Sequence, residues 1–537
     1  MIRCYRGNHQ IDRIITVSSN TTLIGFAISK VRTHIIHTSL HIATTRITHQ
    51  VQTRKQESKK ERQQETMALE LTSKHGGGGG GGLNEAQQKD LQRRINSDCG
   101  PEYWVLKTCR QLKENTWPSE RRLFVDGRSC FPKATQERTD LAHVTFLDAL
   151  LHNNTVTTVT FQNIIFGTQC QSLLETILSG STKLQCLKLH NVSIKDADGS
   201  TSSNSSSSSH LPCALFENLF IQELVIEKCS MNQQELDRLG QMICRSKSLK
   251  TVKLIHVSLA EGVVTTNIDA IANALKSSST CITELDLSQT KLGLDNLTKL
   301  LNGLQCNTTL ETLILDDCDV EDEHYATSIA NFLSQNNNLK ELSLNENCLI
   351  GDSIRIIVQN GLIHNSSLRT LSLNDNPVGD DGAIYLTDML RQSNNSSKLQ
   401  SLSIMNCEIW ERGYQALAQG IATMETLQEL MVEGPELEEH ASELLVSMKQ
   451  NMTLRNLVMA HSIPYRLEQD DETWNQIFWY IQLNRIKRLL LQKQNTPMGL
   501  WPKVLEYSRY EPKFMFYMLQ QKPEFCNNVG TERNVHK

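Results

Sequence analysis

The sequence predicts an α/β solenoid with a parallel sheet on its concave face, helices on its convex face and a helical cap at the C-terminal end. Three observations predict this fold: a short leucine motif recurs eleven times, its spacing is nearly constant, and helix-like apolar stripes separate the copies. Hydrophobic residues make up 39% of the 537 residues and aromatic residues only 5%. This composition favours many small repeated cores over one large aromatic-rich core.

The motif is L-x-x-L-x-L-x-x-(N/C/T)-x-L, and it begins weakly at Val156. Seven of the ten steps between successive copies are 27–29 residues long, and the others are 37, 33 and 31. The later copies start at Leu184, Ile221, Leu249, Ile282, Leu310, Leu339, Leu368, Leu399, Leu427 and Leu454. Such regularity predicts one structural unit stacked many times.

Strand and helix signals alternate within each repeat. The fourth and sixth motif positions share one face of a strand, because side chains alternate along a strand. Strands that all run in one direction must pair in parallel and be covered by the segments between them. Those segments have apolar residues at helical spacing, as in Leu236-Leu239-Met242-Ile243, Ile268-Ile271-Leu275, Leu297-Leu300-Leu301-Leu304 and Ala326-Ile329-Leu333.

The motif resembles the leucine-rich repeats, and the 28–29-residue helical type is similar to ribonuclease-inhibitor-like proteins. The copies at 339–349 and 368–378 match best, and the resemblance extends over about residues 150–465. It implies a horseshoe that binds other proteins. The ninth motif position is expected to be a buried filler that satisfies backbone groups of the turn, and it is occupied by Cys229, Thr290, Cys318, Asn347, Asn376 and Cys407.

Composition divides the chain into five parts. Residues 1–97 form a basic leader, expected to be disordered, and a tether with seven consecutive glycines; residues 1–66 alone have a net charge of +7, which leaves −12 for the remainder. The leader could instead be a transit peptide, or Met67 could be the true start. We expect an N-terminal flanking cap at 98–150, a solenoid of about eleven repeats at 151–465, a helical C-terminal cap at 466–525 and a tail at 526–537.

Two features interrupt or end the repeat. The longest step contains a Ser-rich run through Ser209, which we interpret as a disordered loop extruded from one repeat. After Met459 the period stops, and Trp474, Ile477, Phe478 and Ile481 begin an amphipathic helix. A cap over the exposed end of the solenoid is the simpler interpretation of this region, and a separate docking surface is the alternative.

Several classes of function are disfavoured. The sequence has no zinc-protease, P-loop, nucleophile-elbow or EF-hand motif, so we expect no catalytic residues, no cofactor and no metal. No run approaches the ~18 apolar residues of a membrane span, and a net charge of −5 argues against nucleic-acid binding. Fifteen cysteines without a C-x-x-C pair suggest reduced thiols in the cytoplasm or the nucleus. Without secretion, N-x-S/T triplets such as those at Asn307 and Asn365 are expected to be polar loop residues.

The concave face offers a candidate partner-binding site. Side chains between the motif leucines point to solvent there, and those of the middle repeats are acidic or amidic: Asp286, Asp316, Asp317, Asn345, Glu346, Asn374 and Asp375. With strands ~4.8 Å apart, the carboxylates would form a stripe roughly 15 Å long. Such a stripe favours a cationic partner, although a solvated polar face explains the pattern equally well.

Two functions are compatible with these patterns. The first is a monomeric, non-enzymatic interaction scaffold that binds another protein, one with a basic surface, on the concave face. The second is a regulator of a small GTPase, because Ran GTPase activators share the 28–29-residue repeat. Those relatives typically end in a strongly acidic tail, whereas this chain ends in a Trp-rich segment and a Lys-bearing tail, which disfavours the second hypothesis.

Overall fold

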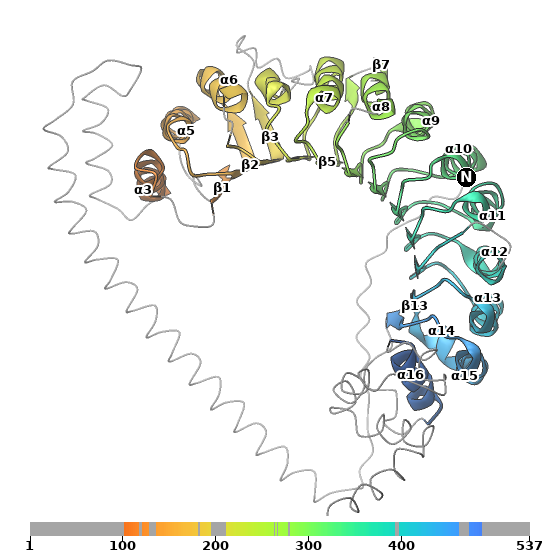
Figure 1. The fold of residues 1–537 in the computed structure, drawn as a ribbon. Helices are drawn as coiled ribbons and strands as arrows, with labels where there is room; N and C mark the ends of the chain where they lie inside the picture. Colours follow the sequence, from red (N-terminus) through yellow and green to blue (C-terminus); the bar gives the residue numbers. More distant parts are fainter. Residues whose placement is uncertain are drawn as a thin grey trace, which may run out of the picture. The chain divides into compact units, whose positions relative to one another are not determined.

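A parallel sheet of twelve strands runs through the described part of the protein. The computed structural model describes residues 101–116, 121–127, 136–180, 183–194, 211–261, 264–265, 267–277, 280–392, 397–460 and 472–485. The strands line the inner side of an arc and the helices lie on its outer side (Figure 1). The predicted α/β solenoid is therefore confirmed.

Eleven of the strands coincide with the eleven copies of the motif, and one strand precedes them. Their order in the sheet is their order in the chain: β1 (Arg122–Asp126), β2 (Thr158–Phe166), β3 (Cys186–Ile194), β4 (Glu223–Glu227), β5 (Thr251–Ile255), β8 (Glu284–Asp286), β9 (Thr312–Ile314), β10 (Glu341–Ser343), β11 (Thr370–Ser372), β12 (Ser401–Ser403), β13 (Glu429–Glu433) and β14 (Asn456–Ala460). The register pairs the fourth motif positions with one another, for example Leu313 with Leu342. These residues are buried, so their periodicity sets the register of the sheet.

The helices follow the strands and pack against their neighbours along the chain. They are α3 (Pro101–Lys113), α5 (Gln136–Leu151), α6 (Gln171–Gly180), α7 (Gln233–Arg245), α8 (Asp269–Lys276), α9 (Gly293–Leu304), α10 (Glu323–Gln335), α11 (Gly351–Asn360), α12 (Gly379–Arg391), α13 (Glu411–Gly420), α14 (Gly434–Glu439), α15 (Ala441–Gln450) and α16 (Glu472–Arg485). The four apolar stripes predicted from helical spacing are buried in α7 to α10. Gly303 lets α9 approach α8 closely, because a Cβ there would come within 2.4 Å of the Ala272 carbonyl oxygen.

The structure adds elements at both ends of the repeat array. Strand β1 pairs in parallel with β2, so the sheet begins before the first leucine motif. Helix α5 overlaps the region expected to be an N-terminal cap, and the amphipathic helix predicted near Trp474 is α16. The leader and tether and the Ser-rich run lie outside the described residues. The 33-residue step between two motif copies includes a short antiparallel pair, β6 (Ala260–Glu261) and β7 (Val264–Thr265). The five domain limits stay a prediction.

Buried asparagines form hydrogen bonds with backbone groups where one helix ends and the next strand begins. The Asn336 amide donates through Nδ2 to the Leu304 carbonyl oxygen of the preceding repeat at 2.7 Å. Its Oδ1 accepts from the backbone N–H groups of Asn338 at 2.9 Å and Leu339 at 2.8 Å. Equivalent contacts are made by Asn307, Asn365 and Asn451. Each repeat thus satisfies backbone groups that its neighbour leaves unpaired.

This arrangement corrects the expectation for the N-x-S/T triplets. Asn307 and Asn365 are only 4% and 2% exposed, so they are not loop residues facing solvent. Their side-chain nitrogens already donate to Leu275 and Leu333 carbonyl oxygens. The triplets therefore mark a structural position of the repeat.

The ninth motif position is filled as predicted by small polar or thiol side chains inside the turn. Cys318 donates through Sγ to the Leu287 carbonyl oxygen at 3.2 Å, and Cys407 to that of Leu373 at 3.1 Å. Asn347 and Asn376 donate to backbone carbonyls of their own and the preceding turn. Burial raises the pKa of Cys318 and of Cys407 to about 12, which keeps both thiols protonated.

We expect Asn336→Ala to lower stability by about 2–3 kcal/mol, since it leaves two backbone N–H groups without their acceptor and removes one of the two donors to the Leu304 carbonyl oxygen. Urea unfolding followed by circular dichroism measures the effect. The neighbouring exposed Asn337→Ala is the matched control and should change the midpoint little. Equal effects of the two substitutions would contradict a structural role for Asn336.

The raised thiol pKa values predict selective labelling. At pH 8 the exposed Cys306 and Cys348 should react with a maleimide in the folded protein, while Cys318 and Cys407 should stay unmodified. Raising the pH to 9 should not release the buried pair, because their pKa values lie near 12. Peptide mass mapping after labelling, with and without denaturant, measures this pattern. Native labelling of Cys318 at a rate similar to that of Cys348 would refute it.

Candidate functional site

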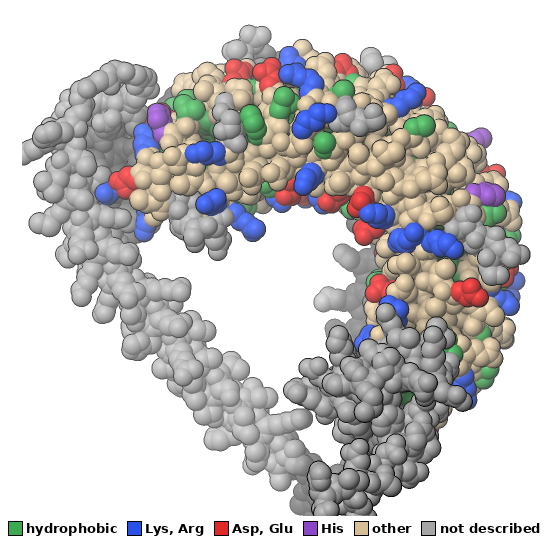
Figure 2. Space-filling view, in the orientation of Figure 1, with side chains coloured by type: hydrophobic (Ala, Val, Ile, Leu, Met, Phe, Trp, Pro, Cys, Tyr) green, Lys and Arg blue, Asp and Glu red, His purple; other side chains and the backbone are tan. Residues whose placement is uncertain are grey.

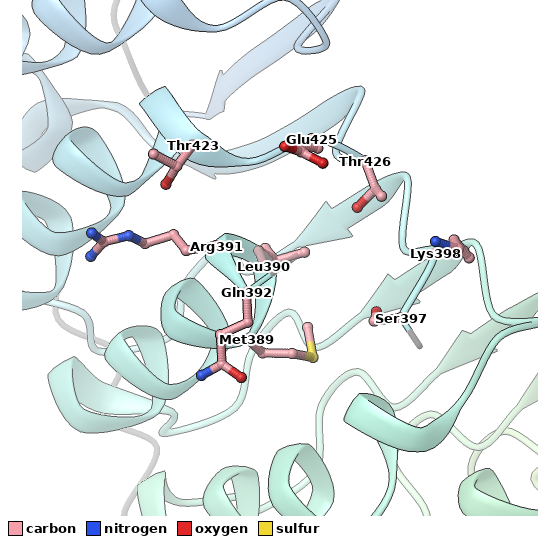
Figure 3. Close-up of a pocket in the computed structure, with 9 residues that line it drawn as sticks. All are labelled: Met389, Leu390, Arg391, Gln392, Ser397, Lys398, Thr423, Glu425 and Thr426. Atoms are coloured by element: carbon pink, nitrogen blue, oxygen red, sulfur yellow. The ribbon is translucent and has the colours of Figure 1, made fainter. Parts of the chain in front are cut away.

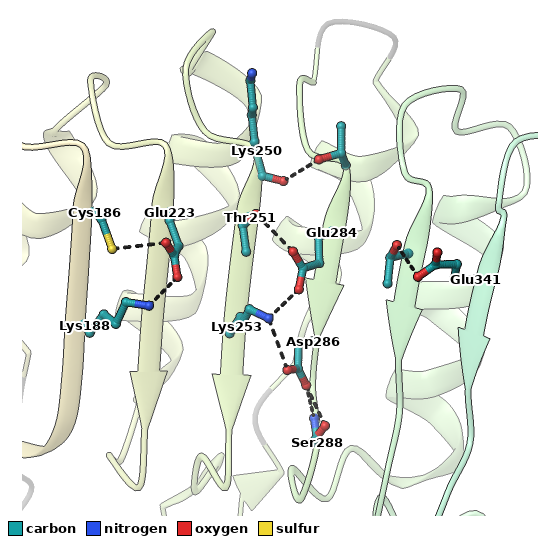
Figure 4. Close-up of polar contacts among 12 residues, drawn as sticks. Cys186, Lys188, Glu223, Lys250, Thr251, Lys253, Glu284, Asp286, Ser288 and Glu341 are labelled. Atoms are coloured by element: carbon teal, nitrogen blue, oxygen red, sulfur yellow. Dashed lines mark hydrogen bonds and ion pairs between the residues drawn. The ribbon is translucent and has the colours of Figure 1, made fainter. Parts of the chain in front are cut away.

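The concave face begins with charges that neutralise one another. Lys188 of β3 contacts the Glu223 carboxylate of β4 at 2.6 Å, and Lys253 of β5 contacts Glu284 of β8 (Figure 4). The hydrogen bond to Glu223 raises the pKa of Lys188. Burial opposes ionisation of Glu223, but the hydrogen bond from Lys188 holds the pKa of this carboxyl below its ordinary value.

A second charged group lies at the end of the same strands. The His190 ring contacts Glu227 through Nδ1 at 2.9 Å, and Lys228 reaches the same carboxylate at 3.3 Å. Figure 2 shows acidic and basic side chains side by side along the inner side of the arc. From β3 to β8 the concave carboxylates therefore already have cationic partners within the protein.

The middle of the concave face carries a different structure, a ladder of hydrogen bonds across strands. We call its members Asp316, Asn345 and Asn374 the inner row. Asp316 Oδ1 accepts from the Asn345 backbone N–H at 2.8 Å and from the Ser343 hydroxyl at 2.7 Å. Asn345 Oδ1 makes the same two contacts with Asn374 and Ser372, and Asn374 Oδ1 with Met405 and Ser403.

The residues that follow the inner row occupy a strained backbone position. Asp317, Glu346 and Asp375, which we call the turn row, have φ angles of 52°, 53° and 58°. Non-glycine residues rarely adopt this left-handed region, and Asn, Asp and His adopt it most readily. In other repeats the equivalent position is Asn163, Asn191, Lys228, His256, Gln289 or Asn406. Among these repeats, acidic residues occupy the position only in the three consecutive repeats from β9 to β11.

The turn row is accessible. Glu346 and Asp375 are exposed and Asp317 is partly exposed. Lys291, which pairs with Asp319 at 2.6 Å, also interacts electrostatically with Asp317. Within the described ranges, no Lys or Arg forms an ion pair with any of the three. Asp375 only accepts a hydrogen bond from the Asn406 side chain at 2.6 Å. These carboxylates are available to a partner.

The seven predicted site residues thus separate into three groups. The inner row is bound within the ladder, and the turn row faces solvent. Asp286 differs from the expectation of a solvent-facing side chain, because it is only 7% exposed and its Oδ1 accepts from the Ser288 hydroxyl at 2.6 Å and backbone N–H at 3.0 Å. A shielded cation also approaches it, since Lys253 lies 3.9 Å from Asp286 Oδ2.

Sequence reasoning missed the serines of the ladder. Ser343 and Ser372 supply hydroxyl donors to Asp316 and Asn345, and Ser403 to Asn374. A signal was present, because Leu-Ser-Leu-Asn occurs at 342–345 and again at 371–374. Ser and Asn two residues apart lie on the same face of a strand.

A pocket of about 290 Å³ among the described residues has mainly apolar and uncharged polar walls, and it is lined by Leu150, Leu151, Asn153, Asn154, Val156, Val159, Thr176, Ile177, Lys183 and Leu184. A pocket of about 40 Å³ lies beside the end of α12 and is lined by Met389, Leu390, Arg391, Gln392, Ser397, Lys398, Thr423, Glu425 and Thr426 (Figure 3). The Arg391 guanidinium points away from Lys398 and Glu425 in this view, so the charged groups do not converge. No group of three or more His, Cys, Asp or Glu side chains suited to a metal ion occurs in the described part of the chain.

The family comparison agrees with the fold. A sequence model described as Leucine Rich repeat matches residues 306–323, 335–356 and 364–386, which span β9 to β11 and their helices. The protein therefore contains leucine-rich repeats, arranged as the parallel solenoid described above. The ribonuclease-inhibitor-like subtype stays a prediction. No curated protein sequence matches this chain.

Three solved structures are similar to this chain at low identity. A tropomodulin C-terminal domain from Caenorhabditis elegans is 15% identical, covering 31% of this chain and 99% of its own, with a TM-score of 0.25. Leiomodin-1 actin-binding site 2 is 20% identical, covering 31% and 95%, with a TM-score of 0.26. An internalin from Listeria monocytogenes is 16% identical, covering 62% and 87%, with a TM-score of 0.32. Values this low carry no information about partners.

No helix within the described ranges combines the length and apolar character needed to cross a bilayer.

The ladder predicts which concave residues are structural. Asn345→Ala should lower stability by about 1–2 kcal/mol, since it removes the acceptor of the Asn374 N–H and the Ser372 hydroxyl. The control is the adjacent Glu346→Asn, which should leave stability unchanged or raise it, because Asn suits the positive φ. Urea midpoints of the two variants decide between these roles. Destabilisation by Glu346→Asn alone would reverse the assignment.

Proposed function

We propose that this protein is a non-enzymatic interaction scaffold that binds a protein partner with a basic surface on its concave face, at β9 to β11. Leucine-rich repeat solenoids present long rigid surfaces on which many weak contacts add up, so binding needs no deep pocket. The fold supports the general role of a protein-interaction scaffold. The chemistry of the partner follows from the charges of the face.

One observation carries the proposal: the concave carboxylates form ion pairs in the early repeats, whereas those of the turn row, in the part of the chain that the structure describes, do not. From β3 to β8 they are paired with Lys188, His190, Lys228 or Lys253. From β9 to β11 the turn row presents three carboxylates with no ion pair among the described residues. A binding surface of one sign attracts the opposite charge and repels like charge, which sets both association rate and specificity.

The placement of the turn row adds to this argument. Residues with positive φ are common at functional positions, where the surrounding fold offsets the strain. Asp317, Glu346 and Asp375 each have a positive φ, and they carry negative charge where other repeats have Asn, Gln, His or Lys. Consecutive strands lie ~4.8 Å apart, so one extended basic segment can contact all three.

We also propose that the protein acts as a monomer in a reducing compartment, the cytoplasm or the nucleus. Seven cysteines of the described ranges have free thiols, namely Cys109, Cys186, Cys229, Cys281, Cys306, Cys318 and Cys407, and several of them occupy buried repeat positions. Free buried thiols suit a reducing environment.

Regulation of a small GTPase is the alternative, and it rests on the repeat length alone. A GTP-hydrolysis assay with candidate small GTPases separates the two hypotheses. Stimulated hydrolysis would favour the alternative, whereas binding to a basic protein without stimulation would favour the scaffold.

The turn row provides the main test. A variant with Asp317→Asn, Glu346→Asn and Asp375→Asn removes three charges but keeps residues that suit the backbone. We expect it to slow association with the natural partner by about tenfold at low salt and to reduce the salt dependence of the rate. Partners are first captured by the full-length protein and identified by mass spectrometry, and rates are then measured by biolayer interferometry.

The control for this test is the triple variant Gln289→Asn, Lys228→Asn and His256→Asn, which changes the same backbone position in the preceding repeats. It should leave association unchanged or accelerate it, since it removes no carboxylate. If the turn-row variant associates at the wild-type rate, the acidic stripe is only a solvated face and the proposal fails.

A further inference from the structure

A surface that begins at the turn row lies where the strands of the middle repeats turn toward their helices. Four segments form it, 317–323, 346–352, 375–381 and 406–412, and we call them the edge loops. Parallel strands in register bring these segments to one edge of the sheet. Backbone hydrogen bonds join neighbours directly, as from Cys348 N–H to the Val320 oxygen at 3.0 Å and from Gly379 N–H to the Cys407 oxygen at 3.0 Å.

The edge loops expose an aromatic side chain that packing does not explain. Trp410 is 63% exposed, more than any other large hydrophobic residue in the described part of the chain. Ile350, at the same repeat position two turns earlier, is 48% exposed. Between them the equivalent residue is Gly379, where an added Cβ would meet nothing within 4 Å. Two apolar side chains thus flank a position without a side chain. The two repeats that carry them are about 10 Å apart where their strands pair and about 20 Å apart where their helices pack.

The backbone at Trp410 is held in place by the neighbouring repeat. Asp380 Oδ1 accepts from the Trp410 N–H at 2.8 Å and from the Gly413 N–H at 2.9 Å. The Asp380 side chain is only 15% exposed. Trp410 is therefore presented from a fixed loop, which reduces the entropy that binding must overcome.

The charge around Trp410 indicates the chemistry of the partner. The edge loops contain twelve Asp or Glu residues, three of which are the turn row, and a single Lys or Arg, Arg412. The equivalent segments of the three preceding repeats, 228–234, 256–262 and 289–295, contain two acidic residues and two lysines. The acidic character thus begins at β9, in the same repeats that carry the exposed apolar pair.

We propose that the edge loops form a docking surface for a Lys- or Arg-rich segment of a protein partner, with Trp410 as the anchor. This inference rests on the proposed function, because it takes the partner to be a basic protein. A guanidinium or ammonium group stacks favourably on an indole face, and surrounding carboxylates strengthen its binding. Exposed Trp residues also contribute strongly to binding when an interface buries them.

Arg412 supports this assignment, because it already forms ion pairs with carboxylates of the edge loops. Its side chain is 68% exposed and lies 3.1 Å from Asp381 Oδ1 and 3.5 Å from Asp380 Oδ2. A cation of the edge loops is therefore already stabilised by these carboxylates. An arginine of the partner would compete with Arg412 for them.

The test uses the full-length chain and a synthetic peptide of alternating Arg and Gly, about 12 residues long, which spans about 40 Å when extended. Fluorescence anisotropy measures its affinity at low and physiological salt, with a Glu-Gly peptide as the negative probe. Trp410→Ala should weaken binding about tenfold or more. Arg412→Gln should instead tighten binding about two- to fivefold at low salt, because it removes a competing positive charge. A gain in affinity cannot result from unfolding.

Phe124→Ala is the matched control, since Phe124 is 55% exposed at the far end of the sheet and should not affect binding. Absence of peptide binding to the wild-type protein, equal affinities of wild type and Trp410→Ala, or weaker binding by Arg412→Gln would each overturn the proposal. Urea unfolding of Trp410→Ala should match that of wild type, because the side chain is exposed.

The two proposals fail separately. With the natural partner, loss of binding in the turn-row variant but not in Trp410→Ala would leave the concave-face proposal standing and overturn the docking surface. The opposite result would retain Trp410 as the anchor and overturn binding through the turn row. Loss in both would support one continuous surface.

Discussion

Backbone groups inside each turn of the solenoid must find hydrogen-bond partners, because water cannot reach them there. A single repeat cannot supply all of these partners. Asn336 closes the end of the preceding helix, Cys318 donates to a carbonyl of the preceding turn, and Asp316 receives an N–H from the following strand. Each turn is therefore complete only when its neighbours are present, and stacking follows from this requirement.

The same requirement decides which concave residues remain available for binding. Inner-row side chains face the hollow of the arc, yet their oxygen atoms are occupied by serine hydroxyls and backbone N–H groups of the next strand. The turn row lies one residue further on, where the chain leaves the strand and its side chains no longer contact the ladder. A shift of one residue thus separates structural amides and carboxylates from accessible ones.

Charge changes in parallel with this division. The first strands balance Glu223 and Glu284 with lysines across the sheet, so that part of the face has little net field. From β9 onward the carboxylates of the turn row and of the edge loops accumulate with Arg412 as the one Lys or Arg of those loops. The mild net charge of −5 conceals this polarity, and the polarity gives the repeats between β9 and β12 their own binding character.

The sequence by itself determined the strand register, the helix faces and the buried ninth position, because each depends on leucine spacing and on local residue size. It also identified Asp317, Glu346 and Asp375 as acidic. Only the tertiary structure decided that Asp316 and Asn345 are bound in a ladder, that Asp286 is buried and that Asn307 and Asn365 are internal. These roles depend on atoms about 30 residues away in the neighbouring turn, a contact that periodicity within one repeat does not specify. Trp410 is a further example. Its place in the repeat could be read from the sequence, but its exposure of 63% could be known only from the tertiary structure.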